Sequence, residues 1–187
     1  RNGYVNEYLY DSSDRLETVR EVATGRELTF EWVGDRIGKV SDPAGREVVY
    51  GYDDGRLTSV TDVGGGVWEF DYDGEGRLAE KIDPVQSASA SPAATVSEYD
   101  GDGRVFRQTA PDGGVWNFDY DSVPNSTVVT MPGAGSHATG AHDAVRLDEY
   151  DWTGRRVRSV EGYGSADAMV WRYDYDHQTG GITAVVL

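Results

Sequence analysis

Bulky side chains recur two positions apart along this chain, and this spacing constrains the fold more than any other feature of the sequence. In one segment Trp68, Phe70 and Tyr72 alternate with Glu69 and Asp71. On a β-strand, residues two apart project to one face, so this segment has an apolar and a polar face. Such alternation predicts a half-buried strand. It recurs at Leu28/Phe30/Trp32, Val48/Tyr50/Tyr52, Trp116/Phe118/Tyr120 and Trp171/Tyr173/Tyr175.

Each predicted strand runs into a turn. Tyr72 is followed by Asp73-Gly74-Glu75-Gly76-Arg77-Leu78, in which Asp can bond the backbone ahead of it and Gly accepts a positive φ. The Tyr-Asp pair recurs at Tyr10-Asp11, Tyr52-Asp53, Tyr99-Asp100, Tyr120-Asp121, Tyr150-Asp151 and Tyr175-Asp176. An arginine usually follows the pair, at Arg15, Arg56, Arg77, Arg104 and Arg155. We interpret the Asp as a turn cap, the aromatic ring as packing, and the Arg as stacking on a ring or pairing with the Asp.

A second set of turns closes each unit on its other side, at 24–26, 42–46, 63–66 and 111–114. Strands joined by tight turns predict an antiparallel meander. After the Arg, apolar residues fall three apart, as Leu57 and Val60 do. On a flat strand such a pair would lie on opposite faces. Either the return strand carries a bulge or it is partly buried on both faces, and we favour the bulge, which would also curve the sheet.

The predicted fold is therefore all-β, with one domain over residues 1–187. Three insertions interrupt the repeat, near 85–95, 131–146 and 162–168, and their small and polar residues predict surface loops. We predict no domain boundary, because the repeat resumes after each insertion.

The charge of the chain narrows its possible partners. It has 33 Asp and Glu against 17 Lys and Arg, a net charge of −16, which disfavours binding to nucleic acid or to anionic membranes. The absence of Cys excludes disulfides, thiolate metal ligands and a Cys nucleophile. No apolar run is long enough to predict a membrane span.

The repeating unit resembles the tyrosine-aspartate (YD) repeat of the rearrangement-hotspot (Rhs) family. Residues 51–57 (GYDDGRL) and 71–78 (DYDGEGRL) are close matches, and about eight imperfect copies cover nearly the whole chain. The resemblance implies that the hairpins form a curved or spiralling sheet, part of a hollow shell like those of polymorphic bacterial toxins, insecticidal toxin complex BC components and teneurins. It also implies a secreted or cell-surface protein. The family's self-cleavage segment has no match, since Asp42-Pro43 and Asp83-Pro84 lie in predicted turns.

No catalytic, cofactor-binding or metal-binding residue is predicted, and we expect the chain not to be an enzyme. Carboxylates are abundant, but none is singled out for acid–base work, so a hydrolase is disfavoured. His137 and His142, with Asp143, lie in a Gly-rich insertion that offers no regular element to fix a metal site.

We expect the chain to be a structural segment of a larger secreted or surface Rhs-type protein. The segment would form part of the wall of a shell that encloses another component. Its partners would be neighbouring repeat segments or copies of itself, joined through exposed strand edges. The resemblance to the Rhs family also implies an enclosed toxin as cargo. The chain would either self-associate or depend on those neighbours for solubility. The alternative is a cell-surface adhesion module that binds glycan through exposed aromatic rings such as Trp68 and Trp116.

Overall fold

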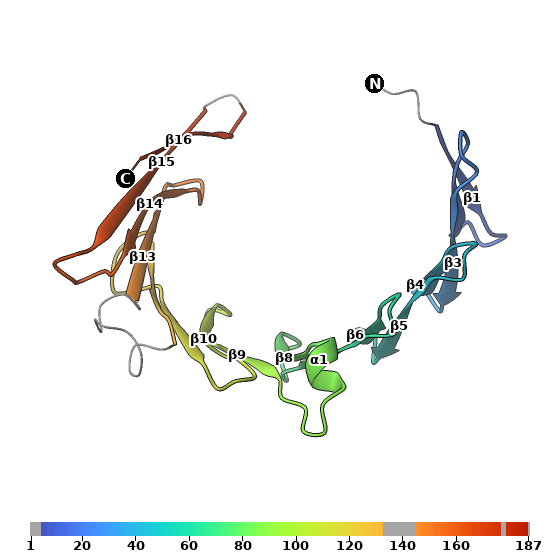
Figure 1. The fold of residues 1–187 in the computed structure, drawn as a ribbon, viewed down its shortest axis with the longest axis horizontal. Coiled ribbons are helices and arrows are strands. Elements are labelled where there is room, and N and C mark those ends of the chain that lie inside the picture. Colours follow the sequence, from blue (N-terminus) through green and yellow to red (C-terminus); the bar gives the residue numbers. More distant parts are fainter. Residues whose placement is uncertain (1–4, 133–144, 177–178, 187) are drawn as a thin grey trace. The chain divides into compact units, whose positions relative to one another are not determined.

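The computed structural model describes residues 5–132, 145–176 and 179–186. Contacts divide the chain into two compact units, Arg1–Ala94 and Thr95–Leu187, which are described separately here. The predicted all-β meander is confirmed in both, because within each unit every strand pairs antiparallel with the next along the chain (Figure 1). The grouping of residues 1–187 into one domain stays a prediction.

The first unit contains eight strands and one short helix. The strands are β1 (Asn6–Tyr10), β2 (Leu16–Glu21), β3 (Glu27–Val33), β4 (Arg36–Ser41), β5 (Glu47–Asp53), β6 (Arg56–Thr61), β7 (Val67–Tyr72) and β8 (Leu78–Ile82). They pair in sequence order from β1 to β8. The helix α1 (Pro84–Ser87) follows, and Asp83 caps it by accepting bonds from the N–H groups of Val85 and Gln86.

The second unit repeats the same meander with eight further strands. These are β9 (Thr95–Tyr99), β10 (Val105–Thr109), β11 (Val115–Asp119), β12 (Ser126–Thr130), β13 (Val145–Tyr150), β14 (Arg156–Glu161), β15 (Met169–Tyr175) and β16 (Ile182–Val186). They also pair in sequence order. Strand β12 was not anticipated, because its sequence, STVVT, has no aromatic triplet.

The alternation of apolar and polar residues is confirmed in the strands that define the repeat. In β7, Trp68, Phe70 and Tyr72 are half-buried while Glu69 and Asp71 are exposed. The buried hydrophobic residues of the described segments are only Val129, Leu147 and Val160. The aromatic face of the sheet therefore keeps part of each ring accessible to solvent, as expected of a single layer with no second layer packed on it.

The predicted bulge is also confirmed, and it explains the apolar spacing. Tyr52 lies opposite Leu57 and Gly51 opposite Ser59, so the return strand β6 holds one extra residue, Thr58. Leu57 and Val60 therefore share a face. Equivalent register shifts occur in the hairpins β1–β2, β3–β4, β7–β8, β9–β10, β13–β14 and β15–β16.

Regular structure begins earlier than expected at two of the predicted insertions. The segment 85–95 opens with the helical turn of α1, since Asp83 and Pro84 form a favourable helix start. Strand β13 begins at Val145, within the predicted insertion 131–146, because it pairs along its length with β12. Residues 162–168 connect β14 to β15 without regular structure. None of the helices in the described segments has the length and apolarity needed to cross a membrane.

Candidate functional site

Four of the turns that follow a Tyr-Asp pair are each closed by one carboxylate, from Asp11, Asp73, Asp100 or Asp151. In the β7–β8 turn, Asp73 Oδ1 accepts bonds from the N–H groups of Glu75 (3.0 Å) and Arg77 (2.8 Å). Asp73 Oδ2 accepts a bond from Arg77 Nε at 2.7 Å. The same three bonds recur in the turns from Asp11 to Arg15, from Asp100 to Arg104 and from Asp151 to Arg155. They also recur from Asp42 to Arg46, in a turn of the second set that follows Ser41. The predicted role of Asp as a turn cap is thus present in atomic detail.

A second kind of contact joins a hairpin to the one that follows it at five places, and we call it the turn-to-ring contact. The guanidinium carbon of Arg56, in the β5–β6 turn, lies 5.8 Å from the centroid of the Tyr72 ring in β7. The Tyr72 hydroxyl donates to the carbonyl of Leu57 at 2.8 Å. The ring is therefore held by a cation on its face and by a hydrogen bond at its tip.

Four further turn-to-ring contacts are described within the two units. They join Arg15 to Trp32, Arg36 to Tyr52, Arg104 to Tyr120 and Arg155 to Tyr175. In each, the ring's polar atom donates to the carbonyl of the residue after that arginine, at 2.7 to 2.9 Å. Stacking and pairing with Asp, posed as alternatives for the arginine, occur together in Arg15, Arg104 and Arg155.

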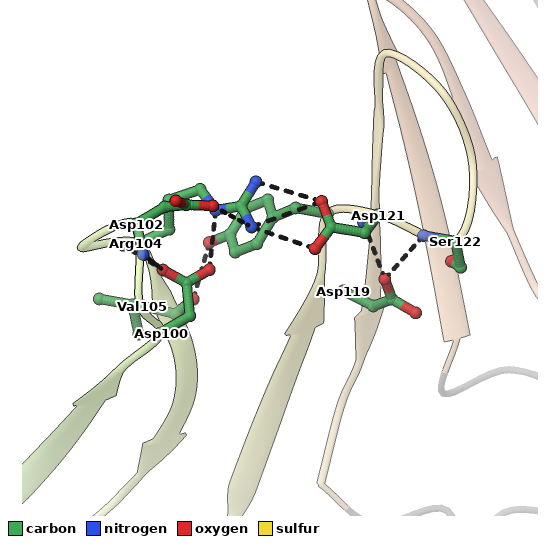
Figure 2. Close-up of polar contacts among 8 residues, drawn as sticks. Asp100, Asp102, Arg104, Val105, Asp119, Asp121 and Ser122 are labelled. Carbon is green, nitrogen blue, oxygen red and sulfur yellow. Dashed lines mark hydrogen bonds and ion pairs between the residues drawn. The ribbon is translucent and has the colours of Figure 1, made fainter.

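Figure 2 shows the contact between Arg104 and Tyr120, in which Arg104 pairs with three carboxylates. Arg104 pairs with Asp100 (2.8 Å), Asp102 (3.3 Å) and Asp121 (3.1 Å), and it lies 4.7 Å from the centroid of the Tyr120 ring. Hydrogen bonds to Asp100, the main cause, and to Asp121 raise the pKa of Arg104. The pKa of Asp100 is lowered, mainly because the Arg104 N–H donates to its carboxylate. The ionised Asp100 thus stabilises the fold above its unfolded pKa, and this stabilisation is lost as pH falls through its folded pKa.

This arrangement offers structure rather than reactivity. Its cation position is filled by an arginine side chain, and the lowered pKa of Asp100 makes that carboxyl a poor proton donor near neutral pH. In the segments that the structure describes, no group of three or more His, Asp or Glu is placed to hold a metal ion. The candidates His137, His142 and Asp143 lie outside the described residues.

A polar cluster in β13–β14 was missed at the level of sequence. Asp148 is only 3 % exposed and accepts a bond from Ser159 Oγ at 2.7 Å. It pairs with Arg146 at 2.9 Å and with Arg156 at 3.5 Å, and Arg156 also lies 4.6 Å from the centroid of the Tyr173 ring. We call Asp148, Arg146, Arg156 and Ser159 the Asp148 cluster.

The position of the Asp148 cluster follows from the repeat. Asp148 lies opposite Ser159 as Tyr50 lies opposite Val60 in β5–β6. Tyr150 lies opposite Arg156 as Tyr52 lies opposite Leu57, so Arg156 occupies the position that an apolar residue, Leu57, holds in β6. The sequence does contain a signal for this cluster. When the repeats are aligned, Asp148, Arg156 and Ser159 occupy positions where the β5–β6 hairpin carries apolar residues.

Comparison with known proteins agrees with this geometry. Residues 53–88 match the family model described as RHS Repeat, so the chain carries an RHS repeat, and the resemblance seen in the sequence is confirmed. None of the curated proteins matches the chain.

Two similar solved structures share the fold. One is the crystal structure of TcdB2-TccC3 without its hypervariable C-terminal region, with a TM-score of 0.63 and 16% identity over 96% of this chain. The other is the crystal structure of TcdB2-TccC3-TEV, with a TM-score of 0.54 and 16% identity over 96% of this chain. The chain spans about a tenth of each, 10% and 11% of their lengths.

Proposed function

We propose that this chain is a non-catalytic structural segment whose hairpins form wall in a larger RHS-type protein. The observation that carries the proposal is the turn-to-ring contact, which uses the same groups in the same way at successive hairpins. A binding or catalytic site is normally built once, from residues that differ from their surroundings. Here the Tyr and Arg side chains that define the repeat join one hairpin to the next, and the Asp side chain caps its own turn.

The fold needs such contacts for stability because its hydrophobic core is small. A single sheet with half-exposed rings buries little apolar surface per residue, so hydrophobic burial contributes less than it does in a two-layered domain. In repeat architectures, contacts between neighbouring units supply the missing stabilisation. The turn-to-ring contact is such a contact between neighbouring units. It therefore supports a structural role, in which successive hairpins form an extended wall.

The larger protein in which this wall would serve is, in our proposal, secreted or displayed at the cell surface. The similar structures belong to TcdB2-TccC3 assemblies, of which this chain matches about a tenth, 10% in the first. Neighbouring repeat segments would be its immediate partners, and an enclosed toxin would be its cargo. The net charge of −16 would help to keep a protein with an exposed sheet face soluble.

A glycan-binding adhesion module is the second candidate, and one observation favours it. An open groove of about 610 Å³ lies between the β2–β3 and β4–β5 turns, with Val19, Leu28 and Pro43 among its apolar lining residues and Arg26 and Arg46 among its polar ones. Apolar floors with polar rims suit sugar rings. Both arginines, however, already pair within the chain, with Glu21 and Asp42.

Replacing Trp68 with alanine separates the two candidates. The wall predicts a loss of about 1.5 kcal/mol in unfolding free energy, roughly half that of a fully buried ring, because Trp68 is half-buried and Lys81 lies on its ring. The matched control is Trp152→Ala, at a ring 95 % exposed in a turn, which should leave stability unchanged. Denaturant unfolding gives the stability, and titration with cell-wall sugars gives the binding. Saturable sugar binding that Trp68→Ala abolishes without loss of stability would contradict the wall.

A further inference from the structure

The aromatic face of the first unit has a groove at a position where later hairpins carry a tryptophan. Trp68, Trp116 and Trp171 each lie on the first strand of a hairpin, opposite the last strand of the preceding hairpin. Leu28 of β3 and Val48 of β5 hold the same position and are smaller. Leu28 is 46 % exposed and lines the groove of about 610 Å³ between the β2–β3 and β4–β5 turns. The groove therefore lies where this hairpin lacks the ring that later hairpins have.

The groove extends from Leu28 in the direction that a tryptophan ring would take. In the β7–β8 hairpin, Lys81 Nζ lies 5.5 Å from the centroid of the Trp68 ring, so this indole lies beside the returning strand β8. The returning strand of the β3–β4 hairpin is β4, and the turn that follows β4 forms the opposite wall of the groove through Asp42 and Pro43. A tryptophan at position 28 would thus place its ring in this groove.

Glu21 supplies a hydrogen-bond acceptor in the groove. Its side chain lines the groove and is 14 % exposed. Thr24 and Arg26 donate to Oε2 of Glu21, and these two bonds, first that of Thr24, lower the pKa of its carboxyl. The carboxylate is therefore ionised near neutral pH. Among the residues that the structure describes, none donates a hydrogen bond to the other oxygen, Oε1. The groove thus combines an apolar floor with an acceptor that has no partner there.

We propose that this groove binds the tryptophan side chain of a partner polypeptide. The indole would lie against Leu28 and Val19, and its N–H would donate to Glu21 Oε1. An indole matches the groove because it is a large apolar ring with one donor and no acceptor. A sugar would need several polar partners, and the two arginines at the rim, Arg26 and Arg46, already pair within the chain. The inference goes beyond the proposed wall function, since a wall needs no ring from a partner at this place.

A short peptide tests the proposal: Gly-Gly-Trp-Gly-Gly, blocked at both ends and titrated into the whole chain labelled with ¹⁵N. We expect saturable shifts of the amide signals of Leu28 and Ala44, with a dissociation constant of about 1 mM, since a single ring is buried. The same peptide with 1-methyltryptophan cannot donate the hydrogen bond, and it should bind about fivefold more weakly.

Leu28→Trp is the decisive variant, because its own ring would fill the groove. It should weaken peptide binding by about tenfold or more, since a tethered ring competes at high effective concentration. The matched control is Val49→Trp, which adds the same ring to β5 on the face away from Val48 and should leave binding unchanged. Thermal unfolding of both variants shows that each keeps the fold.

The absence of saturable shifts at about ten times the expected dissociation constant would overturn the proposal. So would peptide binding that Leu28→Trp leaves unchanged. Shifts of Leu28 caused by cell-wall sugars or by free indole, but not by the peptide, would assign the groove to a small molecule and would also overturn it. Trp152, 95 % exposed, provides the last arm. Self-association of the chain that Trp152→Ala abolishes and the peptide displaces would make a second copy the occupant, against the proposal.

Discussion

Replacing Asp148 with alanine is expected to lower the free energy of unfolding by about 3 kcal/mol, the loss typical of breaking a buried ion pair. The carboxylate is 3 % exposed and is the common partner of Arg146, Arg156 and Ser159. Its removal leaves Arg146 and Arg156, whose side chains are 34 % and 40 % exposed, without their shared counter-charge. Denaturant unfolding of the variant beside the original chain measures the effect.

A control variant, Asp174→Ala, shows how much stability is lost when an aspartate side chain is removed without leaving an unpaired charge. Asp174→Ala removes an exposed carboxylate from β15 and should change stability by less than about 0.5 kcal/mol. Replacing the whole cluster with apolar residues (Asp148→Leu, Arg146→Val, Arg156→Leu and Ser159→Val) should recover most of the loss, because no charge is then left uncompensated. An Asp148→Ala variant as stable as Asp174→Ala would contradict this account of the cluster.

Replacing Gly76 with alanine is expected to cost about 2 kcal/mol, from strain at a positive φ together with a lost ring contact. Gly76 has a φ of +83°, a conformation that suits glycine. A methyl group there would lie 2.9 Å from a guanidinium nitrogen of Arg56, which must then move away from Tyr72. Thermal and denaturant unfolding report the loss.

Gly74→Ala is the matched control in the same turn. Gly74 has no positive φ, and a methyl group there would meet nothing within 4 Å, so its replacement should be close to neutral. Equal stability of the two variants would show that neither the φ of Gly76 nor its contact with Arg56 matters to the fold.

The sequence predicts the strands well where aromatic residues mark them. Trp68, Phe70 and Tyr72 fix the strand, its face and its turn, because period-two spacing and the Asp-Gly turn act locally. The spacing of Leu57 and Val60 even predicts the bulge. Strand β12 could not be found in this way, since its STVVT segment carries no ring and its pairing with β13 depends on residues distant in the chain.

Only one of the two interactions of the repeat arginine could be predicted from the sequence. An Asp four residues before an Arg predicts a turn pair, because both lie in one short loop. The partner of the Arg guanidinium across to the next hairpin, 16 residues on for Arg56 and Tyr72, depends on the sheet register and not on the local sequence. The Asp148 cluster shows the same limit, since Asp148 and Ser159 become partners only when the bulge sets their register.

The most direct test of the wall compares one substitution at four equivalent positions. Tyr52, Tyr72, Tyr120 and Tyr175 each donate a hydroxyl hydrogen bond to the preceding hairpin. The account predicts that Tyr→Phe at each position lowers the unfolding free energy by a similar amount, about 1 kcal/mol, the value of one such bond. Tyr50→Phe, at a hydroxyl with no hydrogen bond in the described segments, should be neutral. A loss confined to one of the four positions, with the other three unchanged, would contradict it.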